Sequence, residues 1–381
     1  MKLNVRIINF TLISILIIIS YNSVFSMNIN SPNSNYNIKN NDTNVSNCNN
    51  STSKIIQSNQ IIIVDNNERN YRITIPSSDK GTPLSVLFIF PGGGGSYSEF
   101  PQVSNFEQSS EINKMIIIYA ISEKRSISEG EWFLNSASTS FSDINYVDTI
   151  LDKLIENFCI DEAKIFATGY SLGSMFTYEL ACHLSYRFTG IASYAGSMPL
   201  FPIDCQYDFP INIMHIHGDS DSIINYNENW DWKEGEFENV GTMRSVSNLL
   251  SFWNTKYNCS NPINSIEINF ELYDLGYCNN NVSVKHYKLI SQDHEWPIFI
   301  NSTYTSDIII DFLISTSNKP LYSSTSVYNT SSSIVSKDVN STNFETSSSE
   351  PEVSVLVGLP FPWLSFIIGF SVFLRLRPKL S

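Results

Sequence analysis

The sequence predicts an α/β fold, in which helices cover both faces of a mostly parallel sheet. Two observations predict this fold. Runs of apolar residues alternate with segments that have a helical pattern. In addition, the apolar run 163–168 leads directly into Gly169-Tyr170-Ser171-Leu172-Gly173, a serine between two glycines at the start of a helical segment. Ligands bind at the carboxyl ends of the strands in such sheets, so functional residues are expected in the loops there.

The elements follow one another in a simple order. Eight apolar runs predict strands at residues 61–64, 69–75, 84–90, 115–120, 164–168, 190–195, 211–217 and 282–290. Helices are predicted at residues 143–158, 172–185, 242–255 and 305–316. Together they occupy residues 59–316, a length natural for one α/β domain.

The N-terminal segment predicts entry into the secretory route. Residues 1–26 combine Lys2 and Arg6 with the apolar stretch 7–20 and acceptable cleavage positions, which is typical of a signal peptide. An uncleaved anchor is the alternative, but the apolar core is short for a membrane span. Residues 27–58 follow as an Asn-rich leader, with eleven Asn between positions 27 and 54, and are predicted to be disordered.

The C-terminal segment predicts attachment to the outer cell surface. Half of residues 315–350 are Ser or Thr, 18 of 36, so 317–350 reads as a stalk. Residues 351–381 form a hydrophobic tail with a basic end. Its uncharged stretch 353–374 fits a membrane anchor, and a cleaved lipid-anchor signal or free secretion are the alternatives. In each case the domain is expected to be extracellular.

The cysteine content and the net charge limit which ligands and partners are expected. Six cysteines in an oxidising compartment predict disulfides, and without a C-x-x-C or H-E-x-x-H motif no metal site or cofactor is expected. The sequons at Asn41, Asn258, Asn281 and Asn301 are compatible with secretion. A net charge of −14 without basic clusters argues against a nucleic-acid partner.

Ser171 is the predicted nucleophile. A side chain two residues to either side of it would clash where the backbone turns from strand to helix, which explains Gly169 and Gly173. Ser171 would then lie at a helix N-terminus, where the amide of Leu172 and the helix dipole can stabilise an oxyanion. Nucleophile, acid and base in this chain order are typical of an α/β-hydrolase.

The acid is predicted in the loop after the strand 211–217, which reads Gly218-Asp219-Ser220-Asp221. Asp219 can serve as a turn residue that bonds its own backbone, so Asp221 is the preferred acid.

The base is predicted from the positions of the five histidines. His294 lies in a loop after the last strand, in Gln292-Asp293-His294-Glu295-Trp296-Pro297, and is the position that suits the base. His183 on a helix and His215 and His286 within strands are read as structural. His217 ends a strand and is read as a possible supporting residue.

Two further groups of residues are candidates for the site. The run Pro91-Gly92-Gly93-Gly94-Gly95 after a strand predicts an oxyanion loop, with Gly93 the donor beside Leu172. A flexible turn is the alternative. Trp132, Tyr170 and Trp296 are candidates for stacking on an aromatic acyl group or a sugar ring, and for each of them packing is an equally good interpretation.

Several blocks spread over residues 48–297 resemble the secreted polyhydroxybutyrate depolymerase and feruloyl esterase family of α/β-hydrolases, which includes acetylxylan esterases. The blocks are residues 143–148, 158–161, 165–171, 188–196, His217-Gly218 with Asp221, Asn258-Cys259, Tyr277-Cys278 and 294–297. The resemblance implies the triad Ser171, Asp221 and His294 and a disulfide Cys259–Cys278. Cys48, Cys159, Cys182 and Cys205 allow three pairings.

The chain also departs from the family pattern. Pro91-Gly92 stands where the family usually has His-Gly, Leu172-Gly173-Ser174 replaces the usual residues after the elbow, and Glu295 replaces a usual Thr. These departures concern the oxyanion geometry and the substrate preference rather than the triad.

The predicted function is a serine carboxylester hydrolase, first a feruloyl esterase acting on polysaccharide-linked esters of plant cell walls. The alternatives with the same chemistry are an acetylxylan esterase and a polyhydroxyalkanoate depolymerase. An alternative of another class is a non-catalytic surface protein that carries a hydrolase-like domain.

Overall fold

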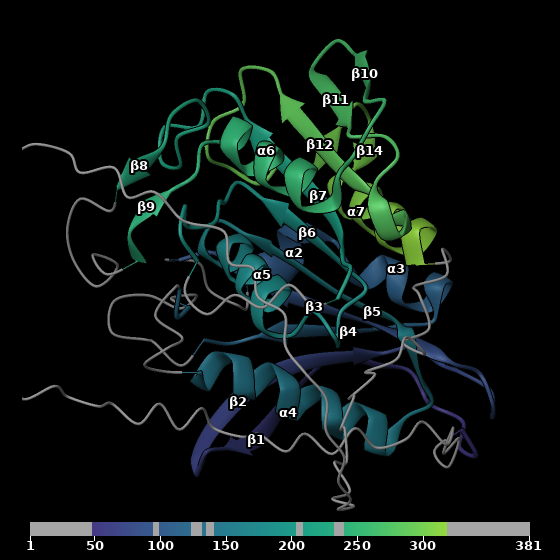
Figure 1. Ribbon diagram of the computed structural model, residues 1–381. Coiled ribbons are helices and arrows are strands. Elements are labelled where there is room, and N and C mark those ends of the chain that lie inside the picture. The colour runs from purple at the N-terminus through teal and green to yellow at the C-terminus, as the bar shows by residue number, and fades with distance from the viewer. Residues whose placement is uncertain are drawn as a thin grey trace, which may run out of the picture. The chain divides into compact units, whose positions relative to one another are not determined.

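The computed structural model describes residues 48–93, 99–122, 132–134, 141–202, 209–231 and 240–317 (Figure 1). The predicted signal peptide, the first part of the leader, the stalk from residue 318 onward, the hydrophobic tail, Asn41 and Cys205 lie outside the described residues.

A ten-stranded sheet forms the centre of the domain, in the order β1-β2-β4-β3-β5-β6-β7-β12-β11-β10. Its strands are β1 (Ile55–Val64), β2 (Asn67–Ile75), β3 (Leu84–Phe90), β4 (Met115–Ala120), β5 (Ile160–Tyr170), β6 (Gly190–Tyr194), β7 (Asn212–Gly218), β10 (Ile263–Ile266), β11 (Phe270–Asp274) and β12 (Val284–Leu289). The six strands from β4 to β12 in this order pair in parallel. Antiparallel strands extend the sheet at both edges. All eight strands predicted from the sequence are present.

The central strands are mainly apolar because both of their faces are covered. Every residue of β3, β4 and β7 is buried. The helices are α2 (Phe100–Ser104), α3 (Glu107–Asn113), α4 (Ser142–Asn157), α5 (Leu172–His183), α6 (Val246–Tyr257), α7 (Thr305–Ser317) and the 3-10 turn η3 (Asn279–Asn281). Two short strand pairs, β8 (Trp230–Asp231) with β9 (Thr242–Met243) and β13 (Phe299–Ile300) with β14 (Thr303–Tyr304), lie in the loops.

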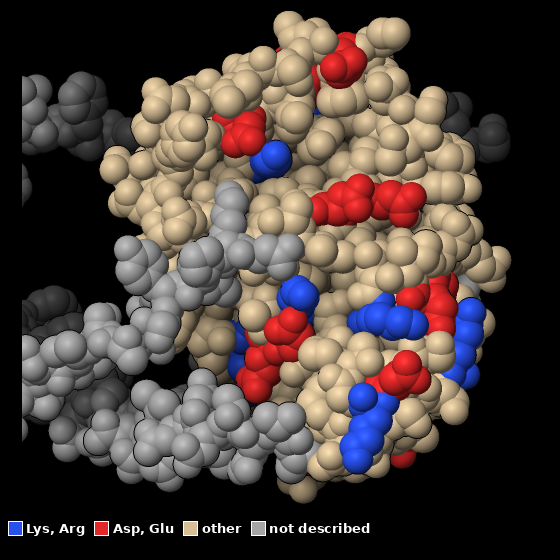
Figure 2. Space-filling view, turned by 90° about the vertical axis from the view of Figure 1, so that its right-hand side faces the viewer, with Lys and Arg blue, Asp and Glu red and all other residues tan. Residues whose placement is uncertain are grey.

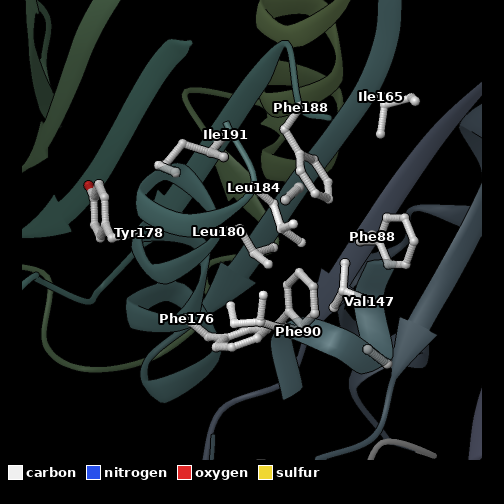
Figure 3. Close-up of a cluster of buried hydrophobic side chains, with 14 of the residues drawn as sticks. Phe88, Phe90, Val147, Ile165, Phe176, Tyr178, Leu180, Leu184, Phe188 and Ile191 are labelled. Carbon is white, nitrogen blue, oxygen red and sulfur yellow. The ribbon is translucent and has the colours of Figure 1, made fainter. Parts of the chain in front are cut away.

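Two hydrophobic clusters occupy the two faces of the sheet. Alternate residues of β3 point to opposite faces, so Phe88 and Phe90 pack with residues of α4, α5 and α6. Leu87 and Ile89 pack instead with residues of α2 and α7. Figure 3 shows the first cluster, with Phe176 of α5 and Phe90 side by side; their ring centroids are 5.1 Å apart. Full burial of such a side chain contributes about 2–3 kcal/mol.

The structure corrects two sequence-based boundaries and adds two strands. Residues 55–58, predicted as disordered leader, belong to β1. The helix predicted from 242 begins at Val246, because Ser245 caps it by accepting the amide of Asn248, and Thr242-Met243 form β9. Strands β10 and β11 were not predicted. Since all four residues of β10 are exposed, its sequence carries no alternation of buried and exposed positions.

Disulfides connect distant parts of the domain. Cys48 bonds to Cys159, at the start of β5, and so ties the residues before β1 to the sheet. Cys259 bonds to Cys278, the pair that the family resemblance implied, next to the hairpin of β10 and β11. Cys182 is also disulfide-bonded.

Charged side chains of both signs mix on the surface. On the face in Figure 2, acidic and basic side chains lie beside one another. Ion pairs of this kind include Lys153 with Glu156 and Arg187 with Asp152, in each case with 2.6 Å between the nitrogen and the oxygen. Within the described part of the chain, no helix has both the length and the apolar character needed to cross a bilayer.

Candidate active site

Ser171 lies in a sharp turn between β5 and α5. Its backbone has φ 54° and ψ −121°, a conformation that non-glycine residues rarely adopt and that often marks a functional position. The amide of Ser171 donates to the carbonyl of Tyr194 on β6 (3.0 Å), and its carbonyl accepts from Met175 in the first helical hydrogen bond (3.0 Å). Both contacts fix the backbone that carries the hydroxyl.

The two glycines around Ser171 are required by close approach of the backbone. A Cβ at Gly169 would lie 2.3 Å from the carbonyl oxygen of Gly173. A Cβ at Gly173 would lie 2.0 Å from the carbonyl oxygen of Phe90 at the end of β3. These close contacts confirm the predicted reason for glycine at both positions, which is that a side chain there would clash with the backbone.

Asp221 lies in the loop after β7, and its side chain is fully buried. Oδ1 accepts the amides of Ile223 (2.9 Å) and Ile224 (2.7 Å). Oδ2 lies 2.8 Å from His294 Nδ1 and 3.1 Å from His217 Nε2. Burial raises the pKa of Asp221, but hydrogen bonds from His217, His294 and Ile224 outweigh it and hold the pKa well below its ordinary value. The side chain is therefore an anion at neutral pH.

His294 connects the other two residues. Its Nδ1 faces Asp221, and its Nε2 lies 2.9 Å from Ser171 Oγ. Asp293 supports the loop, since its Oδ1 accepts the amides of His294 (2.7 Å) and Ser222 (2.8 Å). The structure thus places side chains from positions 171, 221 and 294 in one hydrogen-bonded line.

The aromatic candidates lie in different surroundings. Trp132 is fully buried, stacks on Phe176 and donates its indole N–H to the carbonyl of Pro91 (3.1 Å). Stacking on a substrate is therefore the wrong interpretation for Trp132, because no face of its ring reaches the surface. It instead supports the start of the loop that contains Gly92 and Gly93.

Tyr170 and Trp296 are half-buried and belong to one aromatic cluster with Phe100 and Tyr194. The Tyr170 hydroxyl donates to the carbonyl of His294 (3.0 Å). Burial raises the pKa of Tyr170 to about 12, so this hydroxyl keeps its proton. The support that Tyr170 gives to the loop of His294 was not predicted from the sequence.

The oxyanion candidates lie on two segments that converge on Ser171. Leu172 is the first residue of α5, and amides of a first helical turn have no partner within the helix. Gly92 lies against the serine, since a Cβ there would be 3.0 Å from Ser171 Cβ. Gly93 follows it and is exposed. Among the described residues, no group of three His, Cys, Asp or Glu side chains could hold a metal ion.

Of the remaining histidines, His215, His217 and His286 are buried and His183 is partly buried. His183 lies 3.6 Å from Glu179 on the same helix. His215 and His286 face each other on neighbouring strands β7 and β12, and His217 follows His215 on the same side of β7. Of these four, His217 is the one that contacts Asp221.

The parallel strands at the centre of the sheet and the helices on its two faces identify the fold as that of an α/β-hydrolase. Residues 122–241 match the family model described as Phospholipase/Carboxylesterase. The solved acetyl xylan esterase from Aspergillus awamori has the same fold, with a TM-score of 0.50 and 16% sequence identity, over 67% of this chain and 98% of that one.

Two curated relatives agree with the family resemblance seen in the sequence. A bifunctional acetylxylan esterase/xylanase of Neocallimastix patriciarum is 30% identical over 40% of this chain and 21% of its own length. A protein of Aspergillus niger named "Probable feruloyl esterase C" is 24% identical over 61% of this chain and 84% of its own length. The chain thus spans about a fifth of the first of these relatives and most of the second. The resemblance to this family of esterases is confirmed.

Proposed function

We propose that this chain is a serine carboxylester hydrolase that cleaves esters of plant cell-wall polysaccharides, with feruloyl esters its first substrate class. The observation that carries the proposal is the hydrogen-bonded line from Ser171 through His294 to Asp221. The names of the relatives support the substrate class, since two of them are a feruloyl esterase and an acetylxylan esterase.

In the proposed reaction, Ser171 Oγ attacks the ester carbonyl while His294 Nε2 takes its proton. Asp221 keeps the other imidazole nitrogen protonated and stabilises the imidazolium that forms. The amides of Leu172 and Gly93 stabilise the negative charge on the carbonyl oxygen. His294 then gives its proton to the leaving alcohol, and an acyl-enzyme remains on Ser171.

Water completes the cycle. His294 takes a proton from a water molecule, which attacks the acyl carbon, and the oxyanion donors act a second time. Collapse of this intermediate releases the carboxylic acid, and His294 returns the proton to Ser171. Tyr170 and Trp296, the two half-buried aromatic residues near His294, remain the candidates for contact with the acyl group.

Covalent labelling by a fluorophosphonate probe tests the chemistry. The wild-type chain should react, and Ser171→Ala should abolish the label. Ser220→Ala, a change at an exposed serine beside the acid, is the matched control and should label like the wild type. Absence of label on a folded wild-type chain would favour the alternative of a non-catalytic surface protein.

The substrate class is tested with methyl ferulate, acetylated xylan and short hydroxyalkanoate oligomers. Release of ferulate supports the first choice, whereas acetate or hydroxybutyrate alone would support the acetylxylan esterase or polyhydroxyalkanoate depolymerase. An extracellular site of action, with a C-terminal membrane or lipid anchor, is part of the proposal. Cell-surface labelling before and after phospholipase C treatment distinguishes the two anchors.

A further inference from the structure

A buried histidine lies behind the acid of the candidate triad, and the mechanism proposed above gives it no role. His217 is fully buried at the end of β7, and His215 on the same strand and His286 on β12 are equally buried. Buried imidazoles need partners for both ring nitrogens, because an unpaired polar atom in the interior costs about 1–3 kcal/mol. The partners of each ring indicate where its proton lies.

The surroundings of His217 determine which nitrogen carries the proton. Nε2 lies 3.1 Å from Asp221 Oδ2 and 3.0 Å from the carbonyl oxygen of Ile224. Both neighbours can only accept, since Asp221 is ionised. Nε2 must therefore be the N–H donor. Nδ1 lies 3.2 Å from His215 Nε2 and takes the acceptor role.

The series of buried hydrogen-bonding groups continues beyond His217. If His215 Nε2 donates to His217, His215 Nδ1 must accept, and the Tyr178 hydroxyl lies 2.9 Å from it. Tyr178 in turn accepts a hydrogen bond from Ser193, whose hydroxyl also contacts Ser174. Every group in this series can donate forward once and accept once, so all the bonds point toward Asp221.

The chain of hydrogen bonds returns to the helix that carries the nucleophile. Tyr178 and Ser174 lie on α5, which begins directly after Ser171. Asp221 is thus connected to α5 by two routes. One runs through His294 to Ser171, and the other runs through the buried series from His217 to Tyr178. Burial lowers the pKa of His215 far below its ordinary value, which keeps this ring at one proton.

We propose that His217 is a positioning residue that donates its Nε2 proton to Asp221 Oδ2 and fixes the carboxylate for His294. The role rests on the proposed function, because it concerns the acid of the same triad. Oδ1 accepts two backbone amides. In the proposed arrangement Oδ2 receives N–H donors from both His294, 2.8 Å away, and His217, 3.1 Å away. Without His217, Oδ2 retains His294 alone, and the carboxylate can rotate away from the imidazole.

Two variants at position 217 separate positioning from packing. His217→Leu removes the donor and should lower kcat for methyl ferulate about 10- to 100-fold, the loss expected from a displacement of about 1 Å, with KM unchanged. His217→Gln places an amide N–H near the position of Nε2 and should restore kcat to within about fivefold. Equal losses in both folded variants would overturn the proposal.

His286→Leu is the matched control. His286 is equally buried in the same cluster, but it bonds to Tyr226 (2.8 Å) and to the carbonyl of His215 (3.0 Å) rather than to Asp221. This variant should lose stability, as His217→Leu does, while its kcat stays within about threefold of the wild type. A loss of kcat that only follows the fall in melting temperature across these variants would also overturn the proposal.

A measurement on the unaltered chain covers the case in which His217→Leu does not fold. Nitrogen-15 NMR of labelled histidines should show one proton on His217, located on Nε2. A proton on Nδ1, or protons on both nitrogens, would overturn the proposal. This result is independent of activity: if the wild type fails to react with the fluorophosphonate probe, the proposed function fails while the tautomer measurement still decides the hydrogen bond.

Discussion

The serine turn and the loops that carry the acid and the base are positioned by different forces. Around Ser171, backbone atoms approach so closely that Gly169 and Gly173 leave no room for a Cβ. Around His294 and Asp221, side chains position the backbone through hydrogen bonds, as Tyr170 does for the carbonyl of His294. Steric contacts tolerate no added atom, whereas hydrogen bonds can be removed one at a time. A side chain added at either glycine should therefore impair folding, whereas removal of single hydrogen bonds around the acid and the base should reduce activity by degrees.

The largest effect is expected from Gly173→Ala. Its Cβ would lie 2.0 Å from the Phe90 carbonyl, which belongs to a buried strand and cannot move aside. We expect a destabilisation of about 3 kcal/mol or more, measured by thermal denaturation or seen as loss of soluble protein. Gly190→Ala is the control: its Cβ meets the end of the Leu313 side chain at 3.1 Å, and this side chain can adjust. Similar losses of stability in both variants would show that the close backbone contact at Gly173 is not what makes the serine turn intolerant of a side chain.

Asp221→Asn should leave the fold intact and reduce kcat about 10⁴-fold, because the amide no longer favours the imidazole tautomer that accepts the serine proton. Asp219→Asn changes the carboxylate two residues earlier, which accepts the amide of Ser291 (2.7 Å), and should retain most activity. Steady-state kinetics on methyl ferulate compare the two. If Asp219→Asn were the more damaged enzyme, the assignment of the acid would be wrong.

The buried histidines should make the domain sensitive to acid. Burial lowers the pKa of His286 from 6.5 to about 3, although its hydrogen bond to the His215 carbonyl and the nearby Glu271 oppose this. His217, Lys288, Tyr226 and Tyr273 also face the ring. Between these two pH values the unfolded chain binds the proton and the folded one does not, so stability falls as pH decreases below 6.5.

From pH 7 to pH 5 this one group should lower the free energy of unfolding by about 2 kcal/mol, measured by urea unfolding. The slope with pH should be shallower in His286→Leu, which has no proton to bind at this position. Asp221, with a pKa held below its ordinary value, loses its contribution only at more acidic pH. Unchanged stability over this range would contradict the neutral, buried state of His286.

The smallest effect is expected from Tyr170→Phe. Removal of the hydroxyl leaves the His294 carbonyl without this donor and should lower kcat about tenfold, the equivalent of one hydrogen bond, at constant KM. Tyr194→Phe removes the corresponding bond to the Glu295 carbonyl (2.6 Å), one residue further from the base, and should cost less. A rise in KM without a change in kcat would instead support the sequence-based interpretation of Tyr170 as a substrate contact.

The sequence predicted those features that depend on short stretches of chain. Parallel strands such as β3 and β4 are apolar at nearly every position, so their runs could be recognised directly. The edge strand β10 could not, because its exposed residues form no buried pattern. For Trp132 the sequence left substrate stacking and packing open, and the structure supports packing, since Phe90 and Phe176 enclose the ring.

By itself, the sequence determined the turn at Ser171, because the two glycines and the serine act within five residues and local sterics allow them one geometry. It also indicated Asp221 and His294, because both follow strands of a parallel sheet and must lie at the same edge. Only the tertiary structure brought His217 next to Asp221. A histidine in an apolar strand has the same local pattern whether it fills the core or binds a carboxylate, and the packing of β7 against β12 and α5 distinguishes the two.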